Sequence, residues 1–183
     1  MVVNGKTVQT KGAPPNGLYH LSTEGEFGSD LIDLFTPPVR VEFKFLKQET
    51  ISSGSAMVYG FTLPAEKNAF WTIRGGRDSN INPEIRGKLW LQSQSGRLLR
   101  LQIEPLHLPP QFIIAAAKTV TDYDDVSLGD AGVFLLPTSS ETSACIRRRD
   151  FNTNLVCVHN AMSFHNCRKF APKARILGEP DSH

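Results

Sequence analysis

Most of this chain alternates between apolar and polar residues with a period of two, which is typical of β-strands that bury one face. The clearest example spans residues 39–45, where every second side chain is apolar and the intervening Arg40, Glu42 and Lys44 are charged. Alternate side chains of a strand point to opposite faces of the sheet. The segment is therefore predicted to be a strand with one face in the core and the other in water.

The same pattern predicts further short strands that are separated by polar turns. They cover residues 56–63, 70–74, 85–91, 98–104, 118–126, 133–136, 140–146, 156–164 and 174–177. About nine or ten short strands joined by close turns are typical of an antiparallel meander. We therefore expect a mainly β (α+β) fold, in which a curved antiparallel meander sheet or half-barrel has one apolar and one polar face.

One segment, residues 26–35, has the apolar spacing of a helix instead. Its apolar side chains recur at i, i+4, i+7 and i+8 and so form one stripe: Phe27, Leu31, Leu34 and Phe35. Two prolines follow directly and would end the helix. We expect this amphipathic helix to cover the apolar face of the sheet, because helix on sheet is a stable way to bury both apolar surfaces.

Two cysteines, Cys145 and Cys157, stand at equal distances on either side of Phe151. A hairpin folded about Phe151 would place them directly opposite each other, about 4.5–5.5 Å apart at Cα. A disulfide needs about 4.4–6.8 Å. The spacing therefore predicts a Cys145–Cys157 disulfide and an oxidising compartment, and it leaves Cys167 as a free thiol.

The composition of the chain indicates its broad structural class but says little about its activity. The chain has 183 residues, 40% of them hydrophobic, which suits one globular domain over residues 1–178 with a disordered tail over 179–183. A net charge of +2 gives no bias toward nucleic acid, and no apolar run approaches the length of a membrane span. Residues 1–10 lack a hydrophobic signal core. Either the protein is cytosolic, or the chain starts after its signal.

Four aspartates form the first candidate site, a calcium site, because hard cations take several oxygen ligands. They are Asp122, Asp124, Asp125 and Asp130. Asp122 and Asp124 would lie on one face of a strand, and Asp130 in the turn that follows. The spacing does not match an EF-hand loop, so a solvated strand end with turn-forming aspartates is the favoured interpretation.

A polar group on the last long strand is the second candidate. His159, Ser163 and His165 are separated by even numbers of residues and would share one face. Ser163 would lie roughly 7 Å from His165 and roughly 13 Å from His159 along the strand. A nucleophile and its base need about 2.6–3.2 Å, so surface polar residues are the favoured interpretation. No zinc, phosphate-loop, dinucleotide or nucleophile-elbow motif occurs in the sequence.

Bulky apolar residues are the third candidate. Phe43, Phe45, Phe61, Trp71 and Trp90 would either pack under the helix or line an apolar groove for an acyl chain. A curved sheet has more apolar surface than one short helix can shield. This mismatch supports the groove as an alternative to core packing.

The order of motifs also resembles a group of uncharacterised exported proteins of the acidobacterial (soil bacterial) type. The resemblance runs from about residue 4 to residue 176 and rests on residues 25–28, 33–35, 87–91, 96–101, 134–137, 159–160 and 166–170. The sheet-plus-helix pattern of that group is similar to the half-barrel of periplasmic lipoprotein carriers. The resemblance implies an exported or periplasmic protein and carries over no functional residue.

Two functions of different classes remain open. The first is an exported, non-enzymatic β-sheet module that binds an amphiphile, lipid or envelope lipoprotein. The alternative is a small hydrolase of an acyl ester or lactone, in which calcium at the aspartates or the Ser163–His165 face would activate water or a nucleophile. In either case we expect a small amphiphilic or acyl-bearing ligand.

Overall fold

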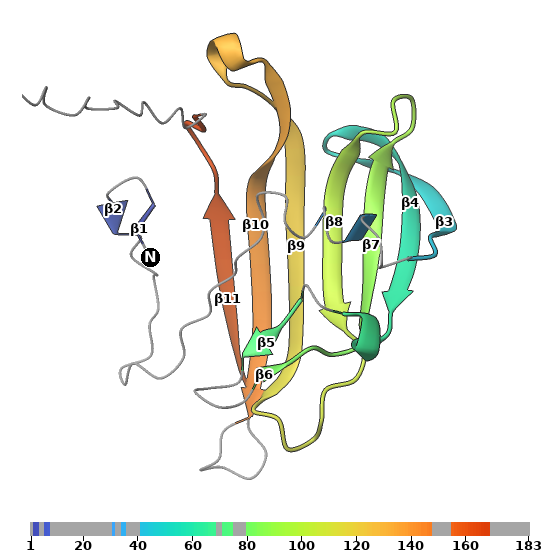
Figure 1. The fold of residues 1–183 in the computed structure, drawn as a ribbon, viewed down its shortest axis with the longest axis vertical. Coiled ribbons are helices and arrows are strands. Elements are labelled where there is room, and N and C mark those ends of the chain that lie inside the picture. The colour runs from blue at the N-terminus through green and yellow to red at the C-terminus, as the bar shows by residue number, and fades with distance from the viewer. Residues whose placement is uncertain are drawn as a thin grey trace, which may run out of the picture.

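A seven-stranded antiparallel sheet forms most of the described chain (Figure 1). The computed structural model describes residues 2–3, 6–7, 31, 34–35, 41–68, 71–74, 80–147 and 155–168. The strand order is β11-β10-β9-β8-β7-β4-β3, so β3 and β11 are the two edges and the sheet does not close into a barrel. The prediction of a mainly β, antiparallel fold is confirmed.

Neighbouring strands of this sheet are also consecutive along the chain, except for the β4–β7 pair, which β5 and β6 separate in the sequence. The strands are β3 (Lys44–Ile51), β4 (Gly54–Leu63), β7 (Ile85–Gln92), β8 (Leu98–Pro105), β9 (Ile114–Ser127), β10 (Val133–Arg147) and β11 (Leu155–Ser163). Between β4 and β7 the chain forms the short 3-10 helix η1 (Ala65–Lys67) and a small hairpin of β5 (Ile73–Arg74) with β6 (Asn80–Ile81). Near the N-terminus, β1 (Val2–Val3) pairs with β2 (Lys6–Thr7), and η2 (Gly129–Ala131) joins β9 to β10.

Several strands differ in extent from the predicted ones, most clearly β3 and β10. The predicted strand 39–45 overlaps β3 only at Lys44 and Phe45, and β3 continues to Ile51. A bulge between Phe45 and Lys47 shifts the register, and an extra residue of this kind breaks the period-two pattern from which a strand is read. Predicted strands 133–136 and 140–146 are one strand, β10, because a bulge carries it past Pro137. The predicted strand 174–177 lies outside the described residues.

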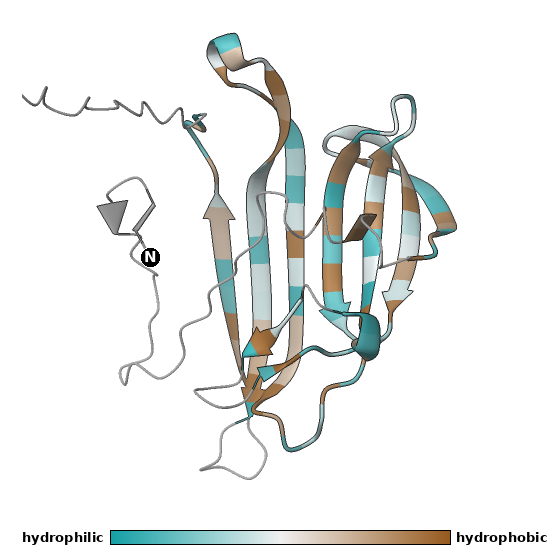
Figure 2. Ribbon diagram, in the orientation of Figure 1, coloured by the Kyte–Doolittle hydropathy of each residue, from teal (hydrophilic) through white to brown (hydrophobic). Residues whose placement is uncertain are grey.

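One face of the sheet, here called the core face, carries the larger hydrophobic cluster. Its buried members include Phe61 and Leu63 on β4, Ile85 and Leu89 on β7, and Leu101 on β8. Figure 2 shows the alternation of hydrophobic and hydrophilic residues along the strands that produces this face. The opposite face, here called the outer face, carries a smaller buried cluster of Ala56, Val58, Trp90 and Leu99.

The core face becomes polar toward β10 without losing its burial. Thr121, Ser140 and Thr142 are 4%, 0% and 4% exposed. The hydroxyl of Thr121 lies 3.3 Å from that of Ser140, and the hydroxyl of Thr119 lies 3.2 Å from that of Thr142. These pairs satisfy polar groups that would otherwise be costly to bury.

The predicted helix over residues 26–35 lies largely outside the described residues, and no covering helix is seen among those that are described. Leu31, Leu34 and Phe35 are described and have helical backbone. Leu34 is fully buried in the core-face cluster and Leu31 packs against it. The apolar stripe therefore contacts the sheet at these two positions, whereas Phe35 is 57% exposed.

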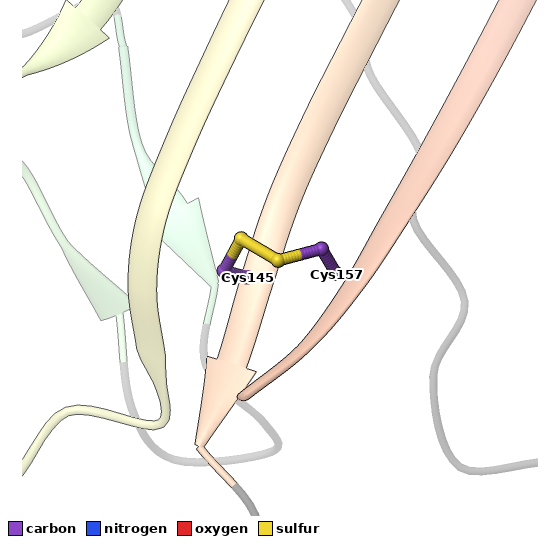
Figure 3. Close-up of a disulfide and its surroundings, with 2 residues drawn as sticks. All are labelled: Cys145 and Cys157. Carbon is purple, nitrogen blue, oxygen red and sulfur yellow. A yellow bond between two sulfur atoms is a disulfide. The ribbon is translucent and has the colours of Figure 1, made fainter. Parts of the chain in front are cut away.

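The predicted disulfide is present (Figure 3). Cys145 on β10 and Cys157 on β11 are direct cross-strand partners, with Cα atoms 4.0 Å apart and a sulfur–sulfur distance of 2.06 Å. Cys167 is a free thiol, as expected. The hairpin register that was inferred from the symmetry about Phe151 is confirmed.

Candidate ligand-binding site

Three phenylalanine rings connect the core face to solvent. Phe35 stacks on Phe43 with 5.5 Å between ring centroids, and Phe43 meets Phe61 edge to face at 5.6 Å. Phe35 is 57% exposed and Phe61 only 5%. We call these three residues the aromatic stack. It forms a continuous apolar path from the surface into the core, and both ring geometries are favourable arrangements for aromatic pairs.

Trp71 packs against the same cluster, and hydrogen bonds from the Asn68 side chain hold its backbone in place. The buried Asn68 side chain accepts a hydrogen bond from the Trp71 backbone N–H at 3.0 Å and donates to the Trp71 carbonyl at 2.9 Å. It also donates to the carbonyl of Pro83 at 2.7 Å. Asn68 thus holds the backbone of Trp71, whose side chain packs against the core-face cluster.

The two remaining aromatic residues of the predicted groove lie elsewhere. Phe45 is 58% exposed at the outer edge of the sheet, where its ring packs edge to face on Tyr59. Trp90 is on the outer face, because Phe61 pairs with Gly87 and Trp90 is three residues further along β7. The structure therefore brings Phe43, Phe61 and Trp71 together and separates Trp90 from them.

The outer face holds a polar network around Trp90. Its indole N–H donates to Glu49, which also pairs with Lys47, and the Arg100 guanidinium lies 5.9 Å from the ring centroid. The ion pair with Lys47, followed by the indole hydrogen bond, lowers the pKa of Glu49. An open depression of about 230 Å³ lies beside this network. It is lined by Trp90, Arg100, Gln102, Lys118, Val120, Asp122 and Glu141.

Three of the four aspartates predicted as calcium ligands form ion pairs with arginines. Arg100 holds Asp122 through two hydrogen bonds of 2.5 and 3.0 Å, and Arg97 contacts Asp124 at 2.6 Å and Asp125 at 2.9 Å. The Asp124 pKa is lowered mainly by the Arg97 hydrogen bond. Asp130 is exposed in η2. Within the described ranges, no three His, Cys, Asp or Glu side chains gather closely enough to hold a metal ion.

The predicted catalytic residues lie in a row on the exposed edge strand. His159 and Ser163 are both exposed on β11, opposite Ser143 and Ser139 of β10. His165 follows the strand and is also exposed. Ser163 makes no side-chain hydrogen bond with either histidine, so the structure does not assemble a nucleophile with its base.

Sequence reasoning missed the arginines that neutralise the aspartates. Arg100 stands in β8 directly opposite Asp122 of β9, and opposite charges at such positions attract each other. The sequence does show Arg100 as a charged residue between Leu99 and Leu101, and such a residue is expected on the solvent-facing side of a strand. Only the β8–β9 register reveals which acidic residue it meets.

In comparisons with known proteins, no family model, curated protein or solved structure matches this chain. None of the helical segments in the described part of the chain is long and apolar enough to cross a membrane.

Proposed function

We propose that this protein is a non-enzymatic β-sheet module that binds an acyl-bearing amphiphile, such as a lipid or the acyl chain of an envelope lipoprotein. The aromatic stack carries the proposal. Its exposed ring, Phe35, lies on Phe43, which leads to the core through Phe61. An acyl chain laid on Phe35 and Phe43 would bury apolar surface on both partners without desolvating a charge.

Two further observations support a binding role. The acidic and hydroxyl groups that a hydrolase would need are held by arginines or stand apart on the β11 edge. No observation favours the hydrolase, and it is not proposed. The Cys145–Cys157 disulfide is compatible with an oxidising compartment, where exported amphiphile-binding proteins work.

The test is a titration with a fluorescent fatty acid, with mass spectrometry of the purified protein for lipid that co-purifies. We expect saturable binding to the native chain. Phe35→Ser should raise the dissociation constant about tenfold, because losing the contact of one aromatic ring costs about 1.5 kcal/mol or more. Phe35 is exposed, so the substitution should leave the fold intact.

Leu155→Ser is the matched control. Leu155 is 53% exposed, similar to Phe35, but it lies on β11 at the other edge of the sheet. This variant should bind as tightly as the native chain. Absence of saturable binding by the native chain would overturn the proposal, and so would equal affinities of the Phe35 and Leu155 variants.

A further inference from the structure

The β9–β10 hairpin projects beyond its neighbours in the sheet. On one side, pairing with β8 ends at the Arg100–Asp122 pair, and on the other, pairing with β11 ends at the Ser139–Ser163 pair. Beyond these points β9 and β10 pair only with each other, up to Val133 and Ser127. Figure 1 shows this two-stranded ribbon rising above the rest of the sheet.

The end of this ribbon is apolar on both faces and carries one acidic residue, Asp130 in η2. Val133, Phe134 and Leu135 are consecutive and are 65%, 39% and 38% exposed; Figure 2 shows this hydrophobic stretch at the start of β10. Of the three aspartates in residues 123–138, Asp124 and Asp125 pair with Arg97, whereas Asp130 has no ion pair among the described residues. We call the three apolar residues, together with Asp130, the hairpin tip.

A second exposed apolar surface lies on the edge strand β3, beside Lys44, which has no ion pair among the described residues. Phe45 and Leu46 are 58% and 51% exposed and stand between Lys44 and Lys47. We call these four residues the β3 patch. The Leu46 side chain lies over Gly60, its tip 3.0 Å from where a Cβ of that glycine would be, so the bulge presents apolar groups on both faces of the edge.

These two surfaces hold most of the exposed apolar side chains. Seven large hydrophobic residues are exposed in the described part of the chain, and five of them belong to the hairpin tip or the β3 patch. Contiguous exposed apolar groups rimmed by charge mark interaction sites. Within one molecule the two surfaces cannot meet, because β8, β7 and β4 separate β9 from β3 by about 19 Å at 4.8 Å per strand.

We propose that the hairpin tip of one copy docks on the β3 patch of a second copy. Val133, Phe134 and Leu135 would cover Phe45 and Leu46, while Asp130 would face the lysines. Among the described residues Asp130 and Lys44 have no ion pair, so both charges are available, whereas Lys47 is shared with Glu49. The contact joins two different surfaces, so each added copy leaves one tip and one patch free and the chain of copies can grow or close into a ring.

Sedimentation velocity over a range of concentrations tests the contact with two variants. The native chain should associate progressively. Phe134→Asp lacks a working tip and Phe45→Asp lacks a working patch, so each should sediment as a monomer. Mixed in equal amounts, they should form a one-to-one dimer and nothing larger, because only one intact tip and one intact patch remain.

Charge and position controls sharpen the result. Asp130→Lys should weaken association, and combining it with Lys44→Glu should restore it. Leu155→Asp changes an exposed apolar residue outside both surfaces and should associate like the native chain. Circular dichroism confirms that each variant is folded.

Three results would overturn the proposal. A native chain that stays monomeric at all concentrations removes the contact altogether. Normal association of the Phe45 variant would point to tip-to-tip pairing instead. A mixture of the two variants that stays monomeric would show that the tip and the patch do not meet. None of these measurements depends on ligand binding at the aromatic stack, so the two proposals can fail separately.

Discussion

At the scale of single residues, two kinds of contact between neighbouring strands stand out in this sheet: a side chain packed against a glycine, and arginines paired with aspartates. Gly87 lies opposite Phe61, whose ring crosses the space that a side chain on Gly87 would fill. Arg97 and Arg100 meet aspartates on the neighbouring strand and turn an acidic segment into a set of ion pairs. Both features are matched across strands and lead to separate predictions.

Gly87→Ala should destabilise the protein. A Cβ at this position would lie 2.1 Å from Cζ of Phe61 and 2.8 Å from the backbone oxygen of Gln102. Overpacking of this kind costs about 1–3 kcal/mol in the free energy of unfolding. Urea denaturation measures the loss. Gly60→Ala is the control, because its Cβ would meet only the flexible side chain of Leu46; equal losses for the two variants would contradict the packing argument.

Asp124→Asn should change stability in a pH-dependent way. The Arg97 hydrogen bond lowers the pKa of folded Asp124 below its ordinary 3.8. The ion pair therefore stabilises the folded state above that value, and the contribution disappears as the pH falls through the lower, folded pKa. Because Asp124 is 61% exposed, the difference at pH 7 should stay below about 1 kcal/mol.

Chemical denaturation of the native and Asp124→Asn chains at pH 7 and near pH 2 measures this effect. The two chains should differ at pH 7 and converge in acid. A difference that is the same at both pH values would show that the ion pair with Arg97 is not its source.

At the scale of elements, β10 is constrained at one end and unsupported at the other. A disulfide links it to β11 near its C-terminal end, and near its N-terminal end it pairs with β9 alone. Cys145 and Cys157 join β10 to the edge strand β11. The same strand β10 runs on past Ser139 into the projecting ribbon, where it loses β11 as a neighbour. One strand thus belongs to the most constrained and the most exposed parts of the sheet.

Removing the disulfide should weaken the fold through its unfolded state. The two cysteines are 12 residues apart, and closing a loop of that length is worth about 3 kcal/mol in chain entropy. Cys145→Ala/Cys157→Ala should lower the free energy of unfolding by about this amount, measured by urea denaturation. Titration of thiols should find one per native chain, Cys167, and three after reduction. An unchanged stability would contradict the entropic argument.

At the scale of the whole molecule, the open sheet carries four surfaces. The core face with its aromatic stack serves the proposed amphiphile, the outer face carries the ion-pair network, and the hairpin tip and β3 patch lie at distant parts of the sheet. An open sheet also leaves two edge strands exposed, and edges favour association with other chains. Ligand binding and self-association are expected to use different residues, and the two surfaces adjoin where Phe43 of the aromatic stack precedes Lys44 of the β3 patch.

The sequence by itself determined what depends on neighbours along the chain. Alternation identified most strands, since side chains two residues apart share a face whatever the strand pairs with. The symmetry of Cys145 and Cys157 about Phe151 identified the disulfide, because a hairpin fixes its own register. Both signals are local and need no knowledge of the rest of the fold.

The tertiary structure decided what depends on register between distant strands. Leu89, Trp90 and Leu91 are three apolar residues in a row, so alternation could not assign Trp90 to a face, and pairing with β4 and β8 placed it outward. Likewise, the four aspartates were a candidate calcium site by sequence, and only the approach of Arg97 and of Arg100 on β8 shows that three of them are ion-paired. A strand's pattern defines two faces, but only its partners decide which residues each face meets.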